Sequence, residues 1–174
     1  MAFMDYKNVL IVDTETTGLD ATKSHLIELA VVLYNIPQKS VVAQCSVVFP
    51  CTTEQAEKWN CIPPTITHIL TKSDVDIGIN MINRLAAHAD VVIAHNATFD
   101  QSFCAQIPAL QLPPTWVCSA KNITWPRYSL SKWPKLKELC EIYKISCDKS
   151  HRALADCHLL IQCLEKANVF CPIT

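Results

Sequence analysis

Residues 8–19 have the sequence Asn-Val-Leu-Ile-Val-Asp-Thr-Glu-Thr-Thr-Gly-Leu, in which an apolar run ends in two acids. The run from Asn8 to Val12 predicts a strand buried on both faces, where a free carboxylate is costly. Because side chains alternate along a strand, Asp13 and Glu15 are expected to point the same way. Their mutual repulsion requires protonation or a cation such as Mg²⁺. An acidic turn that closes a strand is the alternative for a bare Asp-x-Glu pair.

The other apolar segments predict one mixed sheet. Further strands are expected at 26–35, 40–49, 91–94 and 116–118, and helices at 63–70, 76–88, 98–105, 135–143 and 152–166, with Asp76 as a possible cap of the second helix. This order predicts an α/β fold: a mixed five-stranded sheet with helices on both faces and function at the strand ends. Residues 1–174 are expected to form a single domain, because that length is ordinary for one hydrophobic core.

The cysteines and the N-terminus indicate the compartment. The ten cysteines are scattered along the chain, among them Cys45 and Cys118 in expected strands and Cys140, Cys157 and Cys163 in expected helices, and none forms a Cys-x-x-Cys pair. This distribution is typical of reduced thiols and predicts a cytoplasmic protein. The first residues lack the basic start and long apolar stretch of a signal peptide. Glu28 interrupts the most apolar run, at 26–33, so no membrane association is expected.

The charges are unevenly distributed, although the net charge is only −1. Residues 1–120 carry six Lys or Arg and eleven Asp or Glu, whereas residues 121–174 carry nine and five. The stretch 121–137 interleaves five basic residues with three aromatic ones: Lys121, Arg127, Lys132, Lys135 and Lys137, with Trp125, Tyr128 and Trp133. Such a mixture fits a nucleic-acid strand, and it equally fits a solvated loop with aromatic side chains packed under it.

Two more segments place acids beside apolar elements. Residues 91–100, Val-Val-Ile-Ala-His-Asn-Ala-Thr-Phe-Asp, put Asp100 just beyond a buried strand, where it also suits a helix N-terminus. Residues 151–160, His-Arg-Ala-Leu-Ala-Asp-Cys-His-Leu-Leu, put Asp156 inside an otherwise apolar helix that disfavours it. His151 precedes that helix and has a side chain suited to accept a proton from water. Taken singly, Asp156 is also consistent with an exposed acid on a helix, and His151 with a residue of a surface loop.

Together, DTETTGL, HNATFD and HRALADC resemble, in order and spacing, the three motifs of the DnaQ-like DEDDh 3′–5′ exonucleases. This family includes proofreading subunits of DNA polymerases and ribonuclease T. The spacing of His151 and Asp156 resembles the histidine branch, since the tyrosine branch has Tyr where this chain has Arg152. Two segments depart from the family. Ile69 stands where relatives have Gly, and Cys118-Ser119 stands where relatives often have Asp-Thr. The second departure is expected to affect the strand end and local substrate contacts rather than catalysis. The resemblance implies a ribonuclease H-like fold.

The resemblance also implies a two-metal-ion phosphodiester hydrolysis with two Mg²⁺, for which Mn²⁺ substitutes. Asp13 would contact both ions, Glu15 and Asp156 the ion on the nucleophile side, and Asp100 the other. His151 would be the general base that deprotonates the attacking water. Two divalent ions offset the four carboxylates and change the formal charge from −1 to about +3, so weak nucleic-acid binding is expected without metal.

The implied substrates are the 3′ ends of single-stranded DNA or RNA. The backbone around Thr16 and Thr17 would contact the terminal hydroxyl, and Leu19 would wedge against the last base, where an apolar side chain tolerates any base. Leu19 equally fits an ordinary packing residue of the turn. Asn96 and Phe99 are expected among the substrate-binding residues, where they order the second motif.

Two functions from other classes compete with the exonuclease. The first is a binding or assembly module that keeps the fold without turnover; the presence of all four acids and the histidine argues against it. The second is a small-molecule phosphatase, whose activity should depend less on salt than polymer binding does. Preference for DNA or RNA, a homodimer and a polymerase association are left open by the sequence.

Overall fold

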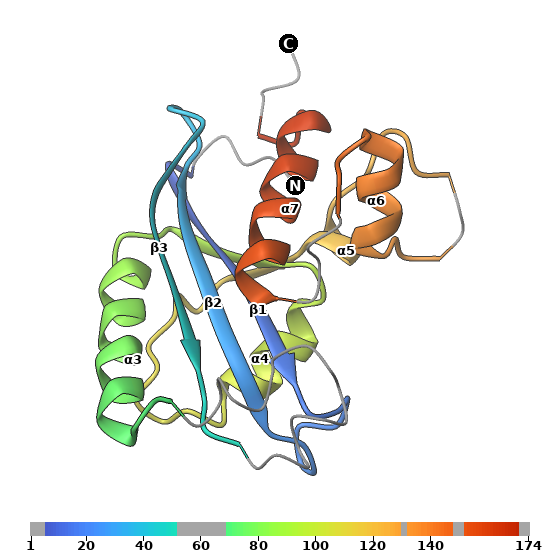
Figure 1. The fold of residues 1–174 in the computed structure, drawn as a ribbon. Helices are drawn as coiled ribbons and strands as arrows, with labels where there is room; N and C mark the ends of the chain where they lie inside the picture. The colour runs from blue at the N-terminus through green and yellow to red at the C-terminus, as the bar shows by residue number, and fades with distance from the viewer. Residues whose placement is uncertain (1–5, 52–68, 130–131, 148–151, 171–174) are drawn as a thin grey trace.

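The computed structural model describes residues 6–51, 69–129, 132–147 and 152–170 as a mixed sheet with helices packed against it (Figure 1). Its five strands lie in the order β3-β2-β1-β4-β5. β1 pairs antiparallel with β2 and β2 with β3, whereas β1 and β4, and β4 and β5, are parallel. The strands are β1 (Asn8–Thr16), β2 (Leu26–Asn35), β3 (Ser40–Val48), β4 (Val91–Ala94) and β5 (Trp116–Cys118).

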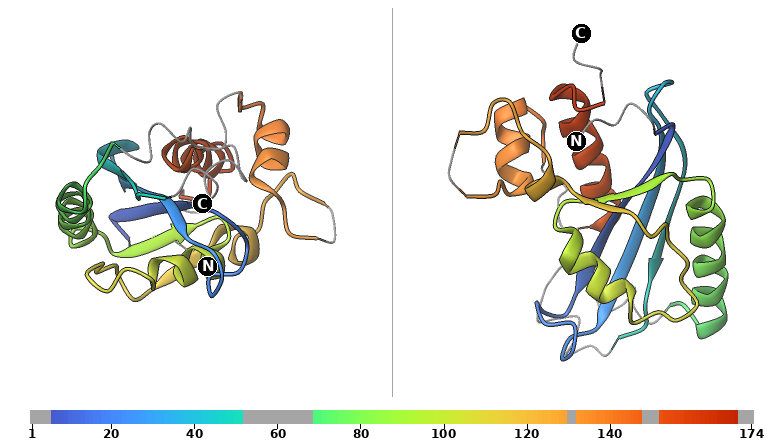
Figure 2. Two further views of the ribbon diagram at one scale, coloured as in Figure 1. Left: turned by 60° about the horizontal axis from the view of Figure 1, so that its bottom comes forward. Right: turned by 180° about the vertical axis from the view of Figure 1, so that it is seen from behind.

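Helices cover both faces of the sheet, as Figure 2 shows from behind and below. α7 (Ala153–Lys166) packs on β1 and β2, with α6 (Leu136–Tyr143) beside it. α3 (Lys72–Ala86) and α4 (Ala97–Cys104) pack on the opposite face. The short α5 (Ser119–Asn122) follows β5 directly. The predicted fold class is therefore confirmed.

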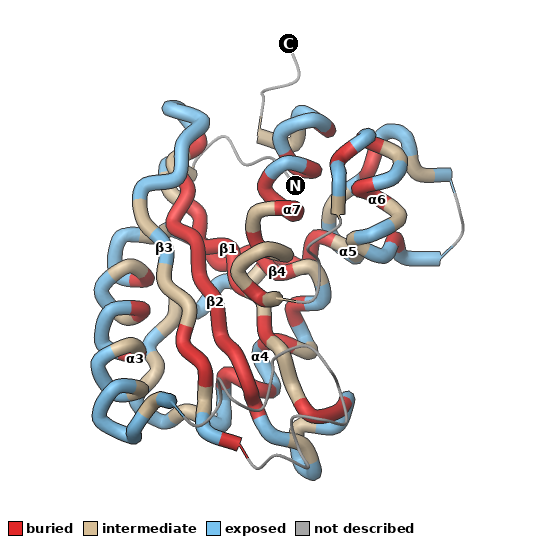
Figure 3. Tube along the Cα trace, viewed as in Figure 1, coloured by how far each residue is buried: buried red, intermediate tan, exposed pale blue. Residues whose placement is uncertain are grey.

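Alternation along β1 produces two cores, one on each face. Val9 and Ile11 contribute to the core under α7, and Leu10 and Val12 to the core under α3 and α4. β2 and β4 are buried along almost their whole length, whereas the continuous buried run of β1 covers Val9 to Val12 (Figure 3). By the same alternation, Asp13 and Glu15 continue the row of side chains that faces α7.

The contact between α3 and β3 explains the glycine inside that helix. A Cβ at Gly78 would lie 2.4 Å from Cγ2 of Val47. No real side chain tolerates such a distance, so the close approach of helix and strand requires glycine and offsets its poor helix propensity.

The expected start of α3 is wrong and the short α5 was not predicted, whereas α4, α6 and α7 begin within one residue of prediction. Asp76 does not cap the helix, which begins at Lys72 after the cap Thr71. The Asp74 backbone N–H donates to Thr71 Oγ1 at 3.3 Å, and the Thr71 backbone N–H donates to an Asp74 carboxylate oxygen at 2.8 Å. This reciprocal capping box satisfies donors of the first turn earlier than Asp76 could. The expected helix at 63–70 falls mostly outside the described residues.

The cysteines agree with the expectation of reduced thiols. All eight cysteines within the described part of the chain are free. Among the described helices, none combines the length and the apolar character needed to cross a bilayer.

Candidate active site

Three of the four predicted acids meet on the face of the sheet that α7 covers. Asp13 and Glu15 come from β1, and Asp156 comes from the first turn of α7. One carboxylate oxygen from each lies within 4.8 Å of the other two. A set of carboxylate oxygens at this spacing is the donor chemistry that Mg²⁺ or Mn²⁺ prefers. The residues present therefore fit a divalent metal ion.

The fourth acid, Asp100, reaches the same region from α4. Its side chain is buried, and its Oδ1 accepts a hydrogen bond of 2.8 Å from the hydroxyl of Thr14, which lies between the two acids of β1. Burial raises the pKa of Asp100 to about 7, although the Thr14 hydrogen bond acts in the opposite direction. Asp100 is thus an acid that a metal ion would convert to its charged form near neutral pH.

Asp13 shows that the four acids act on one another. Burial raises its pKa well above the usual range, and the charges of Asp100, Asp156 and Glu15 raise it further, in that order. Mutual repulsion of this kind is relieved by protons or by cations. The cluster is therefore set up electrostatically to take positive charge.

A fifth acid, Glu28 of β2, lies completely buried beside the cluster. Its carboxylate accepts hydrogen bonds from Nε and Nη2 of Arg152, at 2.9 and 3.1 Å, and from the backbone N–H of Ala153, at 3.2 Å. The hydroxyl of Ser46 donates to it from β3. Arg152 thus balances the charge of Glu28, as a buried carboxylate requires.

The role of Glu28 is to position the helix that carries Asp156. Ala153 is the first residue of α7, so the carboxylate of Glu28 accepts from an N–H of its first turn and interacts favourably with its dipole. Glu28 also stands directly opposite Glu15 in the β1–β2 pairing, where two like charges repel. Sequence reasoning missed this role; the available signal was a lone acid inside the apolar run of β2.

The second motif is held in place by His95, at the carboxyl end of β4. Its Nε2 donates to the carbonyl of Pro134, and its Nδ1 accepts from the hydroxyl of Ser119, both at 2.9 Å. Burial lowers the pKa of His95, which favours this neutral ring. Asn96 is exposed at the cap of α4, and the ring of Phe99 packs against Phe103 with centroids 4.8 Å apart.

The turn after β1 exposes one large apolar side chain. Leu19 is 80% exposed, more than an ordinary packing residue of a turn would be. Thr16 Oγ1 donates to the Gly18 carbonyl at 2.7 Å, and Thr17 is buried, with its Oγ1 accepting from the backbone N–H of His25 at 2.8 Å. The turn is therefore ordered while the end of Leu19 faces solvent.

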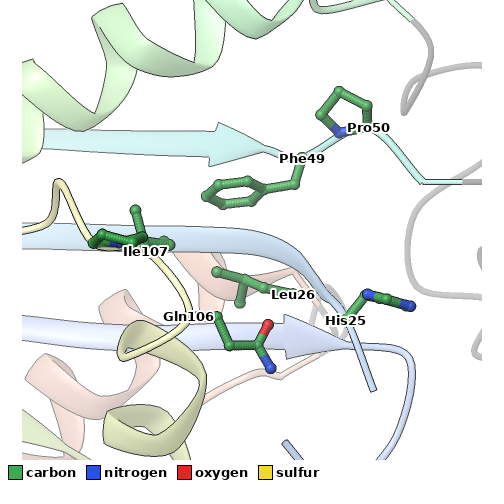
Figure 4. Close-up of a pocket in the computed structure, with 7 residues that line it drawn as sticks. His25, Leu26, Phe49, Pro50, Gln106 and Ile107 are labelled. Carbon is green, nitrogen blue, oxygen red and sulfur yellow. The ribbon is translucent and has the colours of Figure 1, made fainter. Parts of the chain in front are cut away.

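A hollow of about 460 Å³ lies on the other side of this turn (Figure 4). Phe49, Ile107 and Gln106 contribute to its walls, and the side-chain N–H of Gln106 donates to the carbonyls of Ala21 and Ser24. None of the clustered acids lines it. The hollow therefore lies apart from the acid cluster, and Gln106 links its wall to the turn.

His151, the predicted general base, lies outside the described residues. Its neighbour Arg152 is described and is fixed by Glu28. The structure thus brings Asp13, Glu15, Asp100 and Asp156 together, and leaves the histidine as a prediction.

Comparisons with known proteins agree with this geometry. The exonuclease family model named for RNase T matches residues 10–164. No curated protein sequence gives a significant match. The fold is similar to cell-death related nuclease 4 (CRN-4), with a TM-score of 0.69 and 15% identity over 95% of this chain, although the chain spans only 64% of that protein. It is equally similar, at 0.69 and 15%, to the nuclease domain of 3'hExo, a DEDDh family member bound to rAMP, over 98% of this chain and 97% of that domain.

Proposed function

Because the chain belongs to the RNase T exonuclease family, we propose that it removes nucleotides from the 3′ end of single-stranded nucleic acid by metal-dependent hydrolysis. The observation that carries this proposal is the meeting of Asp13, Glu15 and Asp156 within 4.8 Å, with buried Asp100 beside them. Residues more than 140 positions apart have no packing reason to gather carboxylates in this way.

The four acids would hold two Mg²⁺ ions, or Mn²⁺ in their place. Bound there, such ions lower the pKa of a water and stabilise the oxygen that leaves the phosphorus. Thr14 fixes the carboxylate of Asp100, and Glu28 fixes the start of α7 and hence Asp156. These supporting contacts keep the acids close to one another before any ion binds.

His151 would accept the proton of the attacking water. In the sequence it directly precedes Arg152, whose guanidinium donates to the carboxylate of Glu28. A neutral imidazole at pH 7 suits that role. We assign it as the general base on the motif spacing alone.

The end of the strand would be recognised at the turn after β1. Backbone groups of Thr16 and Thr17 would contact the terminal hydroxyl, and exposed Leu19 would pack against the last base. Asn96 and Phe99 would border the same nucleotide. The rAMP bound to the nuclease domain of 3'hExo supports a single nucleotide as the unit that this fold accepts. We further propose that residues 1–174 act as one domain in a reducing compartment such as the cytoplasm, as the free cysteines suggest.

The test is digestion of 5′-labelled single-stranded DNA and RNA with Mg²⁺, Mn²⁺ or EDTA. A ladder that shortens from the 3′ end is expected with either metal and not with EDTA. Asp13→Ala should abolish it, whereas Asp76→Ala, which removes an exposed acid from α3, should not. His151→Ala should lose nearly all activity and still bind metal, as followed by isothermal calorimetry.

Three results would contradict the proposal. Cuts within circular single strands would indicate an endonuclease, and loss of the 5′ label as mononucleotide would indicate the opposite polarity. Full activity in EDTA would show that the acid cluster does not act through a metal ion. Comparison of DNA and RNA in the same assay decides the preferred sugar, since that preference rests on contacts to the 2′-hydroxyl.

A further inference from the structure

The basic–aromatic segment, residues 121–137, presents one of its three aromatic side chains to solvent. Trp125 is buried and its indole N–H donates to the Ser119 carbonyl at 2.9 Å. Tyr128 is half-buried and its hydroxyl donates to Glu138 at 3.2 Å. Trp133 is 64% exposed. Packing thus accounts for the first two rings and leaves Trp133 without a core role.

The charges around Trp133 are predominantly positive. Nζ of Lys121 lies 4.4 Å from the centre of the Trp133 ring, a cation–π contact that orients the indole. Residues 121–137 include five basic residues and no acid. Glu138, the next residue, forms an ion pair with Lys132 at 2.7 Å. Lys121, Lys135 and Lys137 are all exposed, so the surface is complementary to a polyanion.

This surface is joined directly to the second catalytic motif. Pro134, next to Trp133, accepts the hydrogen bond from His95 at the carboxyl end of β4. Asp100 follows five residues after His95, in the first turn of α4. In Figure 1, α6 lies beside α7, whereas α3 lies at the opposite edge of the sheet, next to β3. A strand whose 3′ end reaches the acid cluster can therefore continue onto the basic–aromatic segment.

We propose that Trp133 and the lysines around it bind the single strand upstream of its 3′ end. A base stacks on the face of the indole that Lys121 leaves open, and Lys121 and Lys137 contact flanking phosphates. Stacking on an aromatic ring accepts any base, which suits an enzyme that proceeds along a strand. This inference rests on the proposed exonuclease function and adds the surface that selects polymers over single nucleotides.

The experiment compares two substrates of different length. One is an oligothymidylate of about 12 nucleotides, enough to span a single-strand site. The other is the 4-nitrophenyl ester of thymidine 5′-monophosphate, a single nucleotide that occupies the acid cluster and the turn after β1 but does not extend to the basic–aromatic segment. Trp133→Ala should lower kcat/KM on the oligonucleotide about tenfold, mainly through KM, the order that stacking contributes per base. The ester should be hydrolysed as by wild type, and Trp133→Phe should retain most of the activity on the oligonucleotide.

Salt tests the lysine contacts separately. Lys137→Ala should reduce by about 1 the slope of log kcat/KM for the oligonucleotide against log salt. Ile77→Ala is the matched control for Trp133→Ala. It likewise removes an exposed apolar side chain, 58% exposed, but from α3 on the opposite face of the sheet. It should leave both substrates unaffected. An oligouridylate run in parallel distinguishes RNA from DNA as the bound strand.

The outcomes separate this inference from the proposed function. If wild type hydrolyses neither substrate, the exonuclease proposal fails and this inference with it. If wild type hydrolyses both and Trp133→Ala behaves as Ile77→Ala, only the surface assignment is overturned. It is also overturned if Trp133→Ala lowers ester and oligonucleotide activity equally, because the side chain would then act on the acid cluster and not on the polymer.

Discussion

Removal of Arg152 should destabilise the protein more than removal of the charge it neutralises. In Arg152→Ala, the carboxylate of Glu28, with a side chain 1% exposed, keeps only Ser46 and the Ala153 N–H as partners. Removal of one partner of a buried ion pair leaves the other charge uncompensated and costs about 3–5 kcal/mol. Arg152 itself is 42% exposed, so water partly replaces its guanidinium, and we expect the lower end, about 3 kcal/mol.

The reciprocal change should cost less. In Glu28→Gln the volume is kept and the remaining cation is half in solvent, so the loss is about 1–2 kcal/mol of charge-assisted hydrogen bonding. The double variant Glu28→Gln/Arg152→Ala leaves no buried charge and should be more stable than Arg152→Ala alone. The two sites contact each other, so their effects should not be additive.

Urea unfolding followed by circular dichroism measures all four corners of this cycle. Arg84→Ala, an exposed arginine in the last turn of α3, is the matched control and should cost about 0.5 kcal/mol or less. The reasoning is refuted if Glu28→Gln is at least as destabilising as Arg152→Ala, or if Arg152→Ala is no worse than the Arg84 control.

The remaining predictions concern the acid cluster and the turn. Asp100 has a pKa of about 7 in the folded chain, against an ordinary value of 3.8, so the folded state binds the extra proton. In EDTA the free energy of unfolding should therefore fall as pH rises from about 4 to about 7, by roughly 4 kcal/mol at most for this group; urea titrations that show a rise would contradict it. Mg²⁺ should accordingly raise Tm more at pH 8 than at pH 5, as thermal scans would record. Thr14→Val should weaken Mg²⁺ binding about tenfold by calorimetry, whereas Thr14→Ser, which keeps the hydroxyl, should not. Leu19→Ala should lower kcat/KM about tenfold on oligonucleotides and on the nitrophenyl ester alike, since both place a base at the terminal position, and Tm should be unchanged because the side chain is solvent-exposed; unchanged kcat/KM on both substrates would exclude a contact between Leu19 and the last base.

Local periodicity was enough to predict the sheet and the direction of two acids. The runs of β1, β2 and β4 are apolar and short, and the alternation of β1 correctly placed Asp13 and Glu15 on one side. The start of α3 could not be found in this way. Its first turn is exposed, so the apolar spacing begins only later, and the capping box of Thr71 and Asp74 is a polar signal that apolar periodicity ignores.

Contacts between distant segments explain what the sequence could not predict. Glu28 and Arg152 are 124 positions apart, and nothing local to either indicates the other. The basic–aromatic segment has no regular period, so its sequence does not indicate that Trp125 is buried and Trp133 exposed; tertiary packing decides this. The motif was enough to single out Asp100. Its hydrogen bond to Thr14 could not be predicted, because it depends on how the folded sheet and α4 bring the two residues together.

The isolated acid of β2 also has a consequence for folding. Leu26–Asn35 is buried on both faces, so a shift of its pairing by one residue would exchange one apolar row for another at little cost. Glu28 is the sole charged residue of that strand, and such a slip would turn it toward the apolar side chains of α3 and α4. A single carboxylate therefore specifies the strand alignment, and Glu28→Leu should allow misaligned, aggregation-prone chains even under conditions where the native form remains stable.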